Sequence, residues 1–246
     1  MSTATTTTPS TRPGVRPPPR MLKLPVFEFL KGKHVVLASS SPRRRELLRQ
    51  IGITDFKVVK PKFEEDLDKS RLTVTEYVNE TATAKALEVY SREVEADNDP
   101  ALVIAADTVV LLGDSILEKP KSAKDHFQML QRLRDEKLPH KVYTSVVCIA
   151  PLREPVYPGY SMYRDFEETQ VVFDSEVSDD FLAAYVASGE ARDAAGGYCV
   201  QEKGALMVEK IIGDYNNVVG LPLRLLLKLM EKVLIEDDEE PFQLEN

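Results

Sequence analysis

The stretch ALVIAADTVVLL, residues 101–112, indicates the fold class more directly than any other part of the chain. It is a nearly continuous apolar run without glycine or proline, which predicts a strand buried on both faces at the centre of a sheet. Strands of this kind occur in sheets covered by helices on both sides. Asp107 interrupts the run, and a buried carboxylate costs free energy unless it is paired, hydrogen-bonded or bound to a metal. The sequence therefore predicts either a structural partner for Asp107 or a role in chemistry.

Shorter strands and helices alternate on both sides of this run. Helix starts are marked by Ser41, Thr73, Ser122 and Ser178, residue types that cap helix N-termini. A proline-rich turn between 151 and 159 is followed by a segment that should pair back antiparallel. The order predicts an α/β protein with a mixed sheet. Strands are expected near 34–38, 56–59, 142–150, 167–173 and 205–212, and helices near 43–51, 74–92, 123–134, 179–187 and 222–234.

Composition excludes several classes of protein. Of the 246 residues 43% are hydrophobic, enough for a sizeable core without disulfides or structural metal. Cys148 and Cys199 are the only cysteines, too few for a secreted disulfide framework, so a reducing intracellular compartment is expected. No apolar run approaches the roughly 20 residues that a membrane helix needs. The net charge of −8 argues against general nucleic-acid binding but not against a local anion pocket, so neither nucleic acid nor membrane is an expected partner.

The two ends of the chain differ in composition from the rest. Residues 1–20 are rich in Thr, Ser and Pro and are expected to be a disordered tail, and residues 236–246 are expected to be a solvated acidic tail, with one domain between them at 21–235. The first stretch carries arginines and no acid, as a mitochondrial presequence does. The prolines at 17–19 oppose the amphipathic helix that such a signal needs. A cytoplasmic location is therefore favoured, with a mitochondrial one as the alternative.

The strongest local signal for chemistry is LASSSPRRRELL, residues 37–48. An apolar strand runs through a hydroxyl-rich loop into a helix N-terminus. Ser39 and Ser41 offer hydroxyls, Arg43 and Arg44 offer guanidinium groups, and free backbone N–H groups and the helix dipole add positive potential. This combination suits a phosphate group. A capped surface helix with a solvated basic face explains the same residues equally well, since arginines are common on helix surfaces.

Three further groups are ambiguous when each is taken alone. The acidic stretch at 64–66 offers oxygens to a hard cation such as Mg²⁺, or is simply a solvated turn. Lys85 and Lys119 are placed as ordinary surface lysines are. GGYCVQ, residues 196–201, is a flexible turn into a strand, where backbone can approach a planar ligand closely. The histidines lack metal-ligand spacing, and the sequence contains no P-loop or dinucleotide fingerprint.

Taken in order, these segments resemble the Maf family of nucleoside triphosphate pyrophosphatases. The similarity runs from about residue 34 to 234 and is carried by LASSSPRRRELL, FEEDL, AADTVV, LEKP, HKVYTSV and RDAAGGYCVQEKGALMVEKIIGDYNNVVGLPL. The tails and the stretch 151–164 lie outside it. The resemblance implies a two-lobed fold around a long, bent mixed sheet, with the nucleotide in a cleft between the lobes. It also implies metal-dependent hydrolysis of a nucleoside triphosphate to the monophosphate and pyrophosphate, and a homodimer.

The resemblance also implies roles for individual residues. Asp107 matches the proposed proton acceptor of the family, and Glu65, Lys85 and Lys119 match its charged cleft residues. The expected mechanism is a single displacement by water at the α-phosphorus. Asp107 orients or deprotonates the water, and Mg²⁺ or Mn²⁺, ligated partly by Glu65, bridges phosphate oxygens. The triphosphate is held by four cationic side chains: Arg43, Arg44, Lys85 and Lys119.

Three positions associated with specificity in the family predict the substrate. Arg43, Thr108 and Gln201 match the branch that acts on dTTP and UTP, rather than the branch that acts on 7-methyl-GTP. The Gln201 amide presents a donor and an acceptor, which complement the imide N–H and carbonyl of uracil or thymine. UTP, dTTP and modified pyrimidine nucleotides are the expected substrates. The alternatives are 7-methyl-GTP and a non-catalytic, nucleotide-binding regulator of cell division, which would not need Asp107.

Two positions depart from the family pattern. Ala194 stands where the family has a lysine, and Glu202 stands where it has a glycine. Neither position is one of the residues expected to carry the chemistry. Both flank Gln201 in the sequence, so they are expected to alter the loop around the base rather than the reaction.

Overall fold

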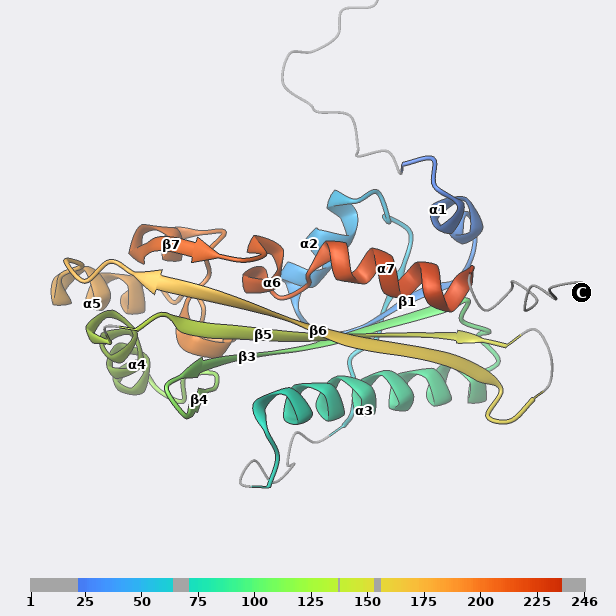
Figure 1. Cartoon of the computed structure of the whole chain (residues 1–246), viewed down its shortest axis with the longest axis horizontal. Coiled ribbons are helices and arrows are strands. Elements are labelled where there is room, and N and C mark those ends of the chain that lie inside the picture. Colours follow the sequence, from blue (N-terminus) through green and yellow to red (C-terminus); the bar gives the residue numbers. More distant parts are fainter. Residues whose placement is uncertain (1–21, 64–70, 137, 153–155, 236–246) are drawn as a thin grey trace, which may run out of the picture.

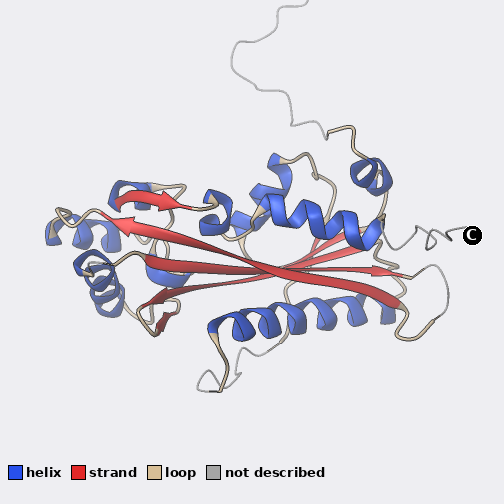
Figure 2. Ribbon diagram, in the orientation of Figure 1, coloured by secondary structure: helices blue, strands red, loops and turns tan. Residues whose placement is uncertain are grey.

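The computed structural model describes residues 22–63, 71–136, 138–152 and 156–235. Within these ranges the chain forms a mixed seven-stranded sheet with helices on both faces (Figures 1 and 2). The strands are β1 (Val35–Ala38), β2 (Lys57–Val58), β3 (Leu102–Leu112), β4 (Ser115–Leu117), β5 (His140–Pro151), β6 (Tyr160–Phe173) and β7 (Val208–Ile212). The helices are α1 (Pro25–Leu30), α2 (Pro42–Gln50), α3 (Val74–Glu95), α4 (Ala123–Asp135), α5 (Asp179–Ala187), α6 (Tyr215–Val219), α7 (Leu223–Leu234) and the short 3₁₀ helices η1 (Ala195–Gly197) and η2 (Lys203–Met207). The predicted fold class is confirmed.

The sheet changes from parallel to antiparallel at β3. Its strand order is β2-β1-β3-β5-β6-β7, with β4 paired to the end of β3. β1 runs parallel to β2 and β3, whereas β3, β5, β6 and β7 pair antiparallel in succession. β1 ends with Ala38 opposite Ala105, and because the two strands run in the same direction, the loop after β1 emerges beside Asp107 and Thr108.

Two apolar cores lie on the two faces of the sheet. Successive residues of a strand point to opposite faces, so Val103 packs in a cluster with Ala82 of α3, whereas Ile104 packs in another with Leu226 of α7. α3 lies along one face, and α7 with α1 lies on the other (Figure 1). This burial on both faces is the reason that the central strand is apolar at nearly every position.

Each half of the elongated sheet carries its own helices. In Figure 1 α1, α2, α3 and α7 gather around the half that contains β1, while α4 and α5 lie at the opposite end, with β7. α4 packs against α5 and against η1. This division agrees with the two-lobed shape implied by the family resemblance.

The predicted helix starts are confirmed by side-chain caps. Ser41, Ser122 and Ser178 each accept a hydrogen bond from a backbone N–H three residues later. Thr73 and Glu76 form a reciprocal capping box at the start of α3. These contacts lie within one turn of chain, which is why the sequence alone indicates them.

The second half of the sheet differs from the prediction. β6 begins at Tyr160 instead of near 167, because it pairs with β5 along its whole length, up to Tyr160 opposite Pro151. Residues 205–207, predicted as the start of a strand, belong to η2 instead. Both differences are set by neighbouring elements and not by local propensity.

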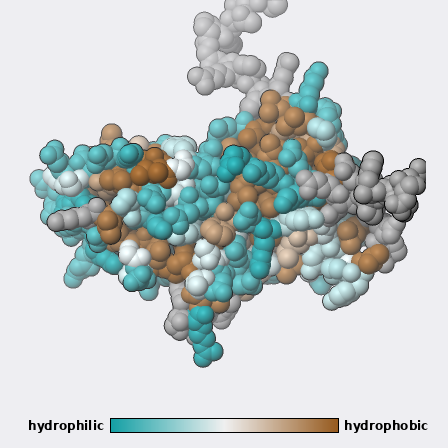
Figure 3. Space-filling view, viewed as in Figure 1, coloured by the Kyte–Doolittle hydropathy of each residue, from teal (hydrophilic) through white to brown (hydrophobic). Residues whose placement is uncertain are grey.

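The face shown in Figure 3 is largely hydrophilic, with hydrophobic residues gathered over α1 and around β7. Among the described helices, none has the length and apolar character required to span a bilayer. The predicted tails, 1–20 and 236–246, lie outside the described residues, so the predicted domain boundaries remain a prediction.

Candidate active site

A cavity of about 620 Å³ is lined by residues from both halves of the molecule. The β1–α2 loop, α3 and β3 contribute to it from one side, and the segments 117–119 and 193–201 contribute from the other. The sequence-predicted site residues meet here, since the cavity is lined by Ser39, Ser41, Arg43, Arg44, Lys85, Asp107, Thr108, Lys119 and Gln201. Glu65, the predicted metal ligand, lies outside the described residues.

The loop between β1 and α2 is organised by its own serines. Ser41 accepts a hydrogen bond from the backbone N–H of Arg44 at 3.5 Å and so caps α2. Ser39 accepts one from the backbone N–H of Ser41 at 3.1 Å. Pro42 occupies the first turn, where its missing N–H is not needed. The positive end of the α2 dipole therefore borders the cavity, an arrangement that favours an anion there.

Arg44 is engaged by the protein itself. Its guanidinium donates to the Gly220 carbonyl at 2.8 Å, to Ser39 Oγ at 3.2 Å and to Thr108 Oγ1 at 2.9 Å. These partners belong to three separate parts of the chain. Arg44 therefore joins the β1–α2 loop, β3 and the end of α6 at one wall of the cavity.

Thr108 continues this network into the sheet. Its hydroxyl lies 2.9 Å from Thr144 Oγ1 on β5, and Thr144 donates to the Asn217 carbonyl at 3.1 Å. Asn217 is fully buried, and its Nδ2 donates to the Val142 carbonyl at 3.0 Å. With both Arg44 and Thr144 within hydrogen-bond distance of its hydroxyl, Thr108 is placed to shape the wall of the cavity.

Asp107 and Lys85 form a buried ion pair beside the cavity. Lys85 Nζ donates to Asp107 Oδ1 at 2.7 Å, and the side chains are only 11% and 10% exposed. Each charge compensates the other, because either one alone at this depth would be destabilising. The second carboxylate oxygen of Asp107 has no hydrogen-bond partner among the described residues. Asp107 thus has a structural partner and also an oxygen available for chemistry.

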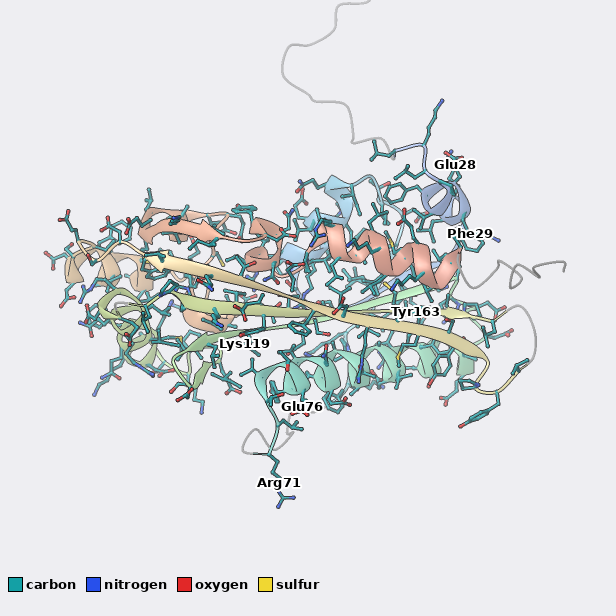
Figure 4. The ribbon with its side chains drawn as sticks, viewed as in Figure 1. Glu28, Phe29, Arg71, Glu76, Lys119 and Tyr163 are labelled. Atoms are coloured by element: carbon teal, nitrogen blue, oxygen red, sulfur yellow. The ribbon has the colours of Figure 1, made fainter. Side chains whose placement is uncertain are left out.

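Two cationic side chains of the cavity, Arg43 and Lys119, make no short hydrogen bond with other described residues. Among the described residues Arg43 makes only long contacts: its Nη1 lies 3.4 Å from Asp193 Oδ1 and 3.6 Å from Cys199 Sγ, and its Nη2 lies 3.4 Å from the Asp193 carbonyl oxygen. Lys119 is exposed and has no hydrogen bond or ion pair with any residue in the described ranges. In Figure 4 Lys119 lies beside the sheet, toward the end of α3 where Glu76 marks the first turn. Positive charge from opposite sides of one cavity suits a polyphosphate.

Gln201 reaches the cavity from the turn that follows η1. Its Nε2 and Oε1 are both buried, and neither has an oxygen or nitrogen partner among the described residues. The nearest thiol is that of Cys199, whose pKa is raised by burial and lowered to a smaller extent by Arg43 and by the Gln201 amide. A buried amide without a proper partner is costly, so this one is suited to pair with the polar edge of a ligand.

The cavity offers few carboxylates for a metal ion. Asp107, Glu118 and Asp193 line it, but the described residues contain no group of three or more His, Cys, Asp or Glu side chains that could hold a metal. Mg²⁺ is commonly bound by one or two carboxylates together with waters and substrate phosphates. The donors therefore fit an ion shared with a bound substrate, and not a site made by protein ligands alone.

Some residues that shape the site are not predicted from the sequence. Thr144 and Asn217 are the clearest cases: both lie in segments that carry the family resemblance, but the sequence assigns neither a role, and the structure shows that they support the cavity wall through Thr108. A signal for Thr144 does exist: like Asp107, it is a polar residue inside a strand predicted to be buried. Asn217 becomes recognisable only when α6 is seen against β5.

Comparison with known proteins agrees with this arrangement. The family described as "Maf-like protein" matches residues 34–233. The chain is 46% identical to the dTTP/UTP pyrophosphatase of Schizosaccharomyces pombe, over 90% of this chain and 92% of that protein. It is 42% identical to the dTTP/UTP pyrophosphatase of Dictyoglomus turgidum, over 81% and 96% respectively. Among solved structures, the Staphylococcus aureus Ham1 protein covers 57% of this chain and 72% of its own, with 16% identity and a TM-score of 0.32, too low to bear on function. Because the family match spans most of the chain and includes every described residue of the cavity, the chain belongs to the Maf-like protein family.

Proposed function

We propose that this chain hydrolyses dTTP and UTP to the nucleoside monophosphate and pyrophosphate. The observation that carries the proposal is the buried Lys85–Asp107 pair beside a cavity that also contains Arg43 and Lys119. Cationic groups suit the triphosphate, and a carboxylate among them suits a reaction rather than binding alone. The relatives that share 46% and 42% of their aligned residues with this chain bear the name dTTP/UTP pyrophosphatase.

In this proposal Asp107 accepts a proton from the water that attacks the α-phosphorus. Lys85 holds Oδ1, so the carboxylate is fixed in orientation and its other oxygen is left for the water. Mg²⁺ or Mn²⁺, held partly by Glu65 together with phosphate oxygens, would neutralise the charge that develops on the leaving pyrophosphate. The phosphorus–oxygen bond to the β-phosphate breaks as the water oxygen bonds to the α-phosphorus.

The triphosphate is held by groups from both sides of the cavity. Arg43 and Lys119 supply positive charge, since neither makes a short hydrogen bond or ion pair with another described residue. Ser39 and Ser41, with the N-terminus of α2, supply further donors. Arg44 acts mainly by holding the loop against Thr108 and Gly220.

The base is read by Gln201. Its amide, which has no oxygen or nitrogen partner among the described residues, offers a donor and an acceptor that match the carbonyl and imide N–H of uracil and thymine. A guanine would present a donor-rich edge and is disfavoured at this position. Leaving such a polar edge unpaired costs about 1–3 kcal/mol, which is tenfold or more in discrimination.

The decisive experiment compares triphosphates directly. We expect kcat/KM for UTP and dTTP to exceed that for CTP, GTP and 7-methyl-GTP, measured as pyrophosphate release with Mg²⁺ or Mn²⁺. A preference for 7-methyl-GTP would overturn the role given to Gln201. Tight nucleotide binding without pyrophosphate release would contradict the proposed activity and favour a non-catalytic, nucleotide-binding regulator.

The assembly and location are part of the same proposal. The family resemblance supports a homodimer, which light scattering of the purified protein would test. The low cysteine content and the prolines at 17–19 support a cytoplasmic location, which fluorescence microscopy of a C-terminally tagged chain would test against a mitochondrial one.

A further inference from the structure

We infer that Glu190 determines base specificity by positioning the turn that carries Gln201. The inference rests on the proposed function, and it assigns a role to a carboxylate that does not line the cavity. Glu190 is therefore a positioning residue that acts through Gln201, and not a group that touches the nucleotide.

The turn that carries Gln201 closes tightly on itself. The Glu202 N–H donates to the Cys199 carbonyl at 3.1 Å. A Cβ atom on Gly204 would lie 2.5 Å from the same carbonyl oxygen and 2.8 Å from the Cys199 nitrogen. Only glycine allows this approach of backbone to backbone. The two ends of the turn, Cys199 and Gly204, are thus in direct contact, with Gln201 between them.

A single oxygen of Glu190 connects to both ends of this turn. Glu190 Oε1 accepts a hydrogen bond from the Gly204 N–H at 3.1 Å. It also accepts one from the Tyr185 hydroxyl at 3.0 Å, and that hydroxyl accepts a bond from the Cys199 N–H at 3.1 Å. The carboxylate therefore ties one end directly and the other through one phenol.

The Glu190 carboxylate is buried, so these hydrogen bonds, and not contacts with solvent, stabilise its charge. The Glu190 side chain is only 5% exposed. Its other oxygen lies 3.3 Å from Lys203 Nζ, but Lys203 is 68% exposed, and ion pairs with such exposed partners contribute little. A carboxylate this deep is retained through its hydrogen bonds to Gly204 and Tyr185.

The position of the turn matters because, among the described residues, the Gln201 amide is held only by its contact with the Cys199 thiol, which belongs to the same turn. Its buried Nε2 and Oε1 lack oxygen and nitrogen partners among the described residues. The backbone of the turn therefore sets where the amide stands. A donor and acceptor pair matches the imide edge of uracil in only a narrow range of positions. Loosening the turn should weaken base reading while leaving the phosphate contacts in place.

The test is the ratio of kcat/KM for UTP to that for 3-methyl-UTP, in which the imide N–H is blocked. We expect Glu190→Ala to lower the ratio about tenfold, through a higher KM for UTP, and to approach the ratio of Gln201→Ala. Glu190→Gln keeps an acceptor oxygen for Gly204 and Tyr185, and should stay within about twofold of wild type. Lys203→Ala, which removes only the exposed ion pair, is the matched control and should leave the ratio unchanged.

A double mutant separates positioning from a structural effect. If Glu190 acts through Gln201, adding Glu190→Ala to Gln201→Ala should lower the ratio no further. An unchanged ratio in Glu190→Ala, or an equal further loss in the double mutant, would overturn the inference. If Glu190→Ala does not fold, the ratio of kcat/KM for UTP to that for 3-methyl-UTP is measured in Tyr185→Phe. This variant removes the hydroxyl that links Glu190 to Cys199, so the ratio should fall, and an unchanged ratio would overturn the inference.

The wild-type measurement keeps the two proposals distinguishable. If wild type releases pyrophosphate from UTP and the Glu190→Ala ratio is unchanged, the inference fails and the proposed function stands. If wild type releases none from UTP or dTTP, both fail.

Discussion

Lys85 and Asp107 stand 22 positions apart in the chain and meet at 2.7 Å beside the cavity. An aspartate inside an apolar strand is a sign of unusual chemistry, but its partner comes from a helix that shows no matching sign. The pair explains how β3 tolerates a carboxylate. It also explains why one oxygen of that carboxylate is fixed while the other is left for the reaction.

Asp107→Asn should therefore stop turnover without unfolding the protein. The amide oxygen can still accept the hydrogen bond from Lys85, but the amide cannot accept a proton from water. We expect kcat for UTP to fall by about 10²–10⁴-fold while the thermal midpoint stays within a few degrees. Lys85→Met serves as the contrast, because it leaves the buried carboxylate unpaired and should also reduce stability. Near wild-type pyrophosphate release by Asp107→Asn would remove Asp107 from the mechanism.

Arg43 and Arg44 are neighbours in the sequence but differ in what they contact. Arg44→Ala removes three hydrogen bonds to Ser39, Thr108 and Gly220, and should lower the free energy of unfolding by on the order of 3 kcal/mol. Arg43→Ala removes only long contacts and should leave stability nearly unchanged, while raising KM for UTP about tenfold or more. Urea denaturation and steady-state kinetics on both variants check this contrast. Equal losses of stability in the two variants would contradict it.

Among the helices and strands, α3 both packs on the sheet and contributes a residue to the site. Its alanine-rich face packs on the sheet, and the same helix delivers Lys85 to β3. The helix is started by a capping box, in which Thr73 accepts from the Glu76 N–H and Glu76 accepts from the Thr73 N–H. These bonds with Thr73 hold the pKa of Glu76 below its usual value.

Thr73→Ala should cost about 1 kcal/mol of stability through loss of this cap. For a chain of this size the expected drop in thermal midpoint is about 2–4 °C. Thr75→Ala, two residues later, keeps the bonds between Thr73 and Glu76 and loses only the contact between the two threonine hydroxyls at 3.2 Å, so it is the control and should change the midpoint much less. Calorimetry measures both. Since neither residue lines the cavity, turnover of UTP should be unaffected, and a large loss of activity in Thr73→Ala would show that the start of α3 matters to the site itself.

At the scale of the whole molecule, His140 makes stability depend on pH. It is buried between Phe173 and Tyr198, and burial lowers its pKa from 6.5 to about 4. Between these two values the unfolded chain binds a proton that the folded chain does not. His140 therefore favours unfolding as the pH falls from about 6.5 toward 4, and has no such effect above that range.

We expect this histidine to account for a loss of up to about 3 kcal/mol between pH 7.5 and 4. Urea denaturation at several pH values measures the loss. His140→Gln removes the ionisation and should flatten the dependence, although its stability at pH 7.5 will be lower because the contact with Tyr198 is changed. An identical pH profile in wild type and His140→Gln would show that other groups control acid stability.

The tails provide a second prediction at this scale. Residues 1–20 and 236–246 contain little apolar material, so removing both should leave the thermal midpoint and the turnover of UTP nearly unchanged. A large loss of thermal stability in the doubly truncated chain would show that a tail packs on the domain. Phe242 and Leu244 would then be the first residues to replace.

Features that depend on a few neighbouring residues can be predicted from the amino-acid sequence. The capped starts of α2, α3, α4 and α5, the buried strand β3 and the serine-rich loop before the arginines of α2 were all predictable. Caps and periodic burial act within one or two turns of chain, so their signals are present in short stretches of sequence. The identity of most site residues was also predictable, because the family resemblance spans both sides of the cavity.

Which polar groups from distant parts of the chain contact each other becomes known only from the folded structure. Arg44 and Gly220 are 176 positions apart. Glu190 accepts a bond from Gly204 and is linked to Cys199 through Tyr185 only because α5 packs against the turn at 199–204. The early start of β6 likewise follows from its pairing with β5. The physical reason is the same in each case: a hydrogen bond depends on distance and direction between atoms, and for residues far apart in the chain these are set by the packing of the whole fold.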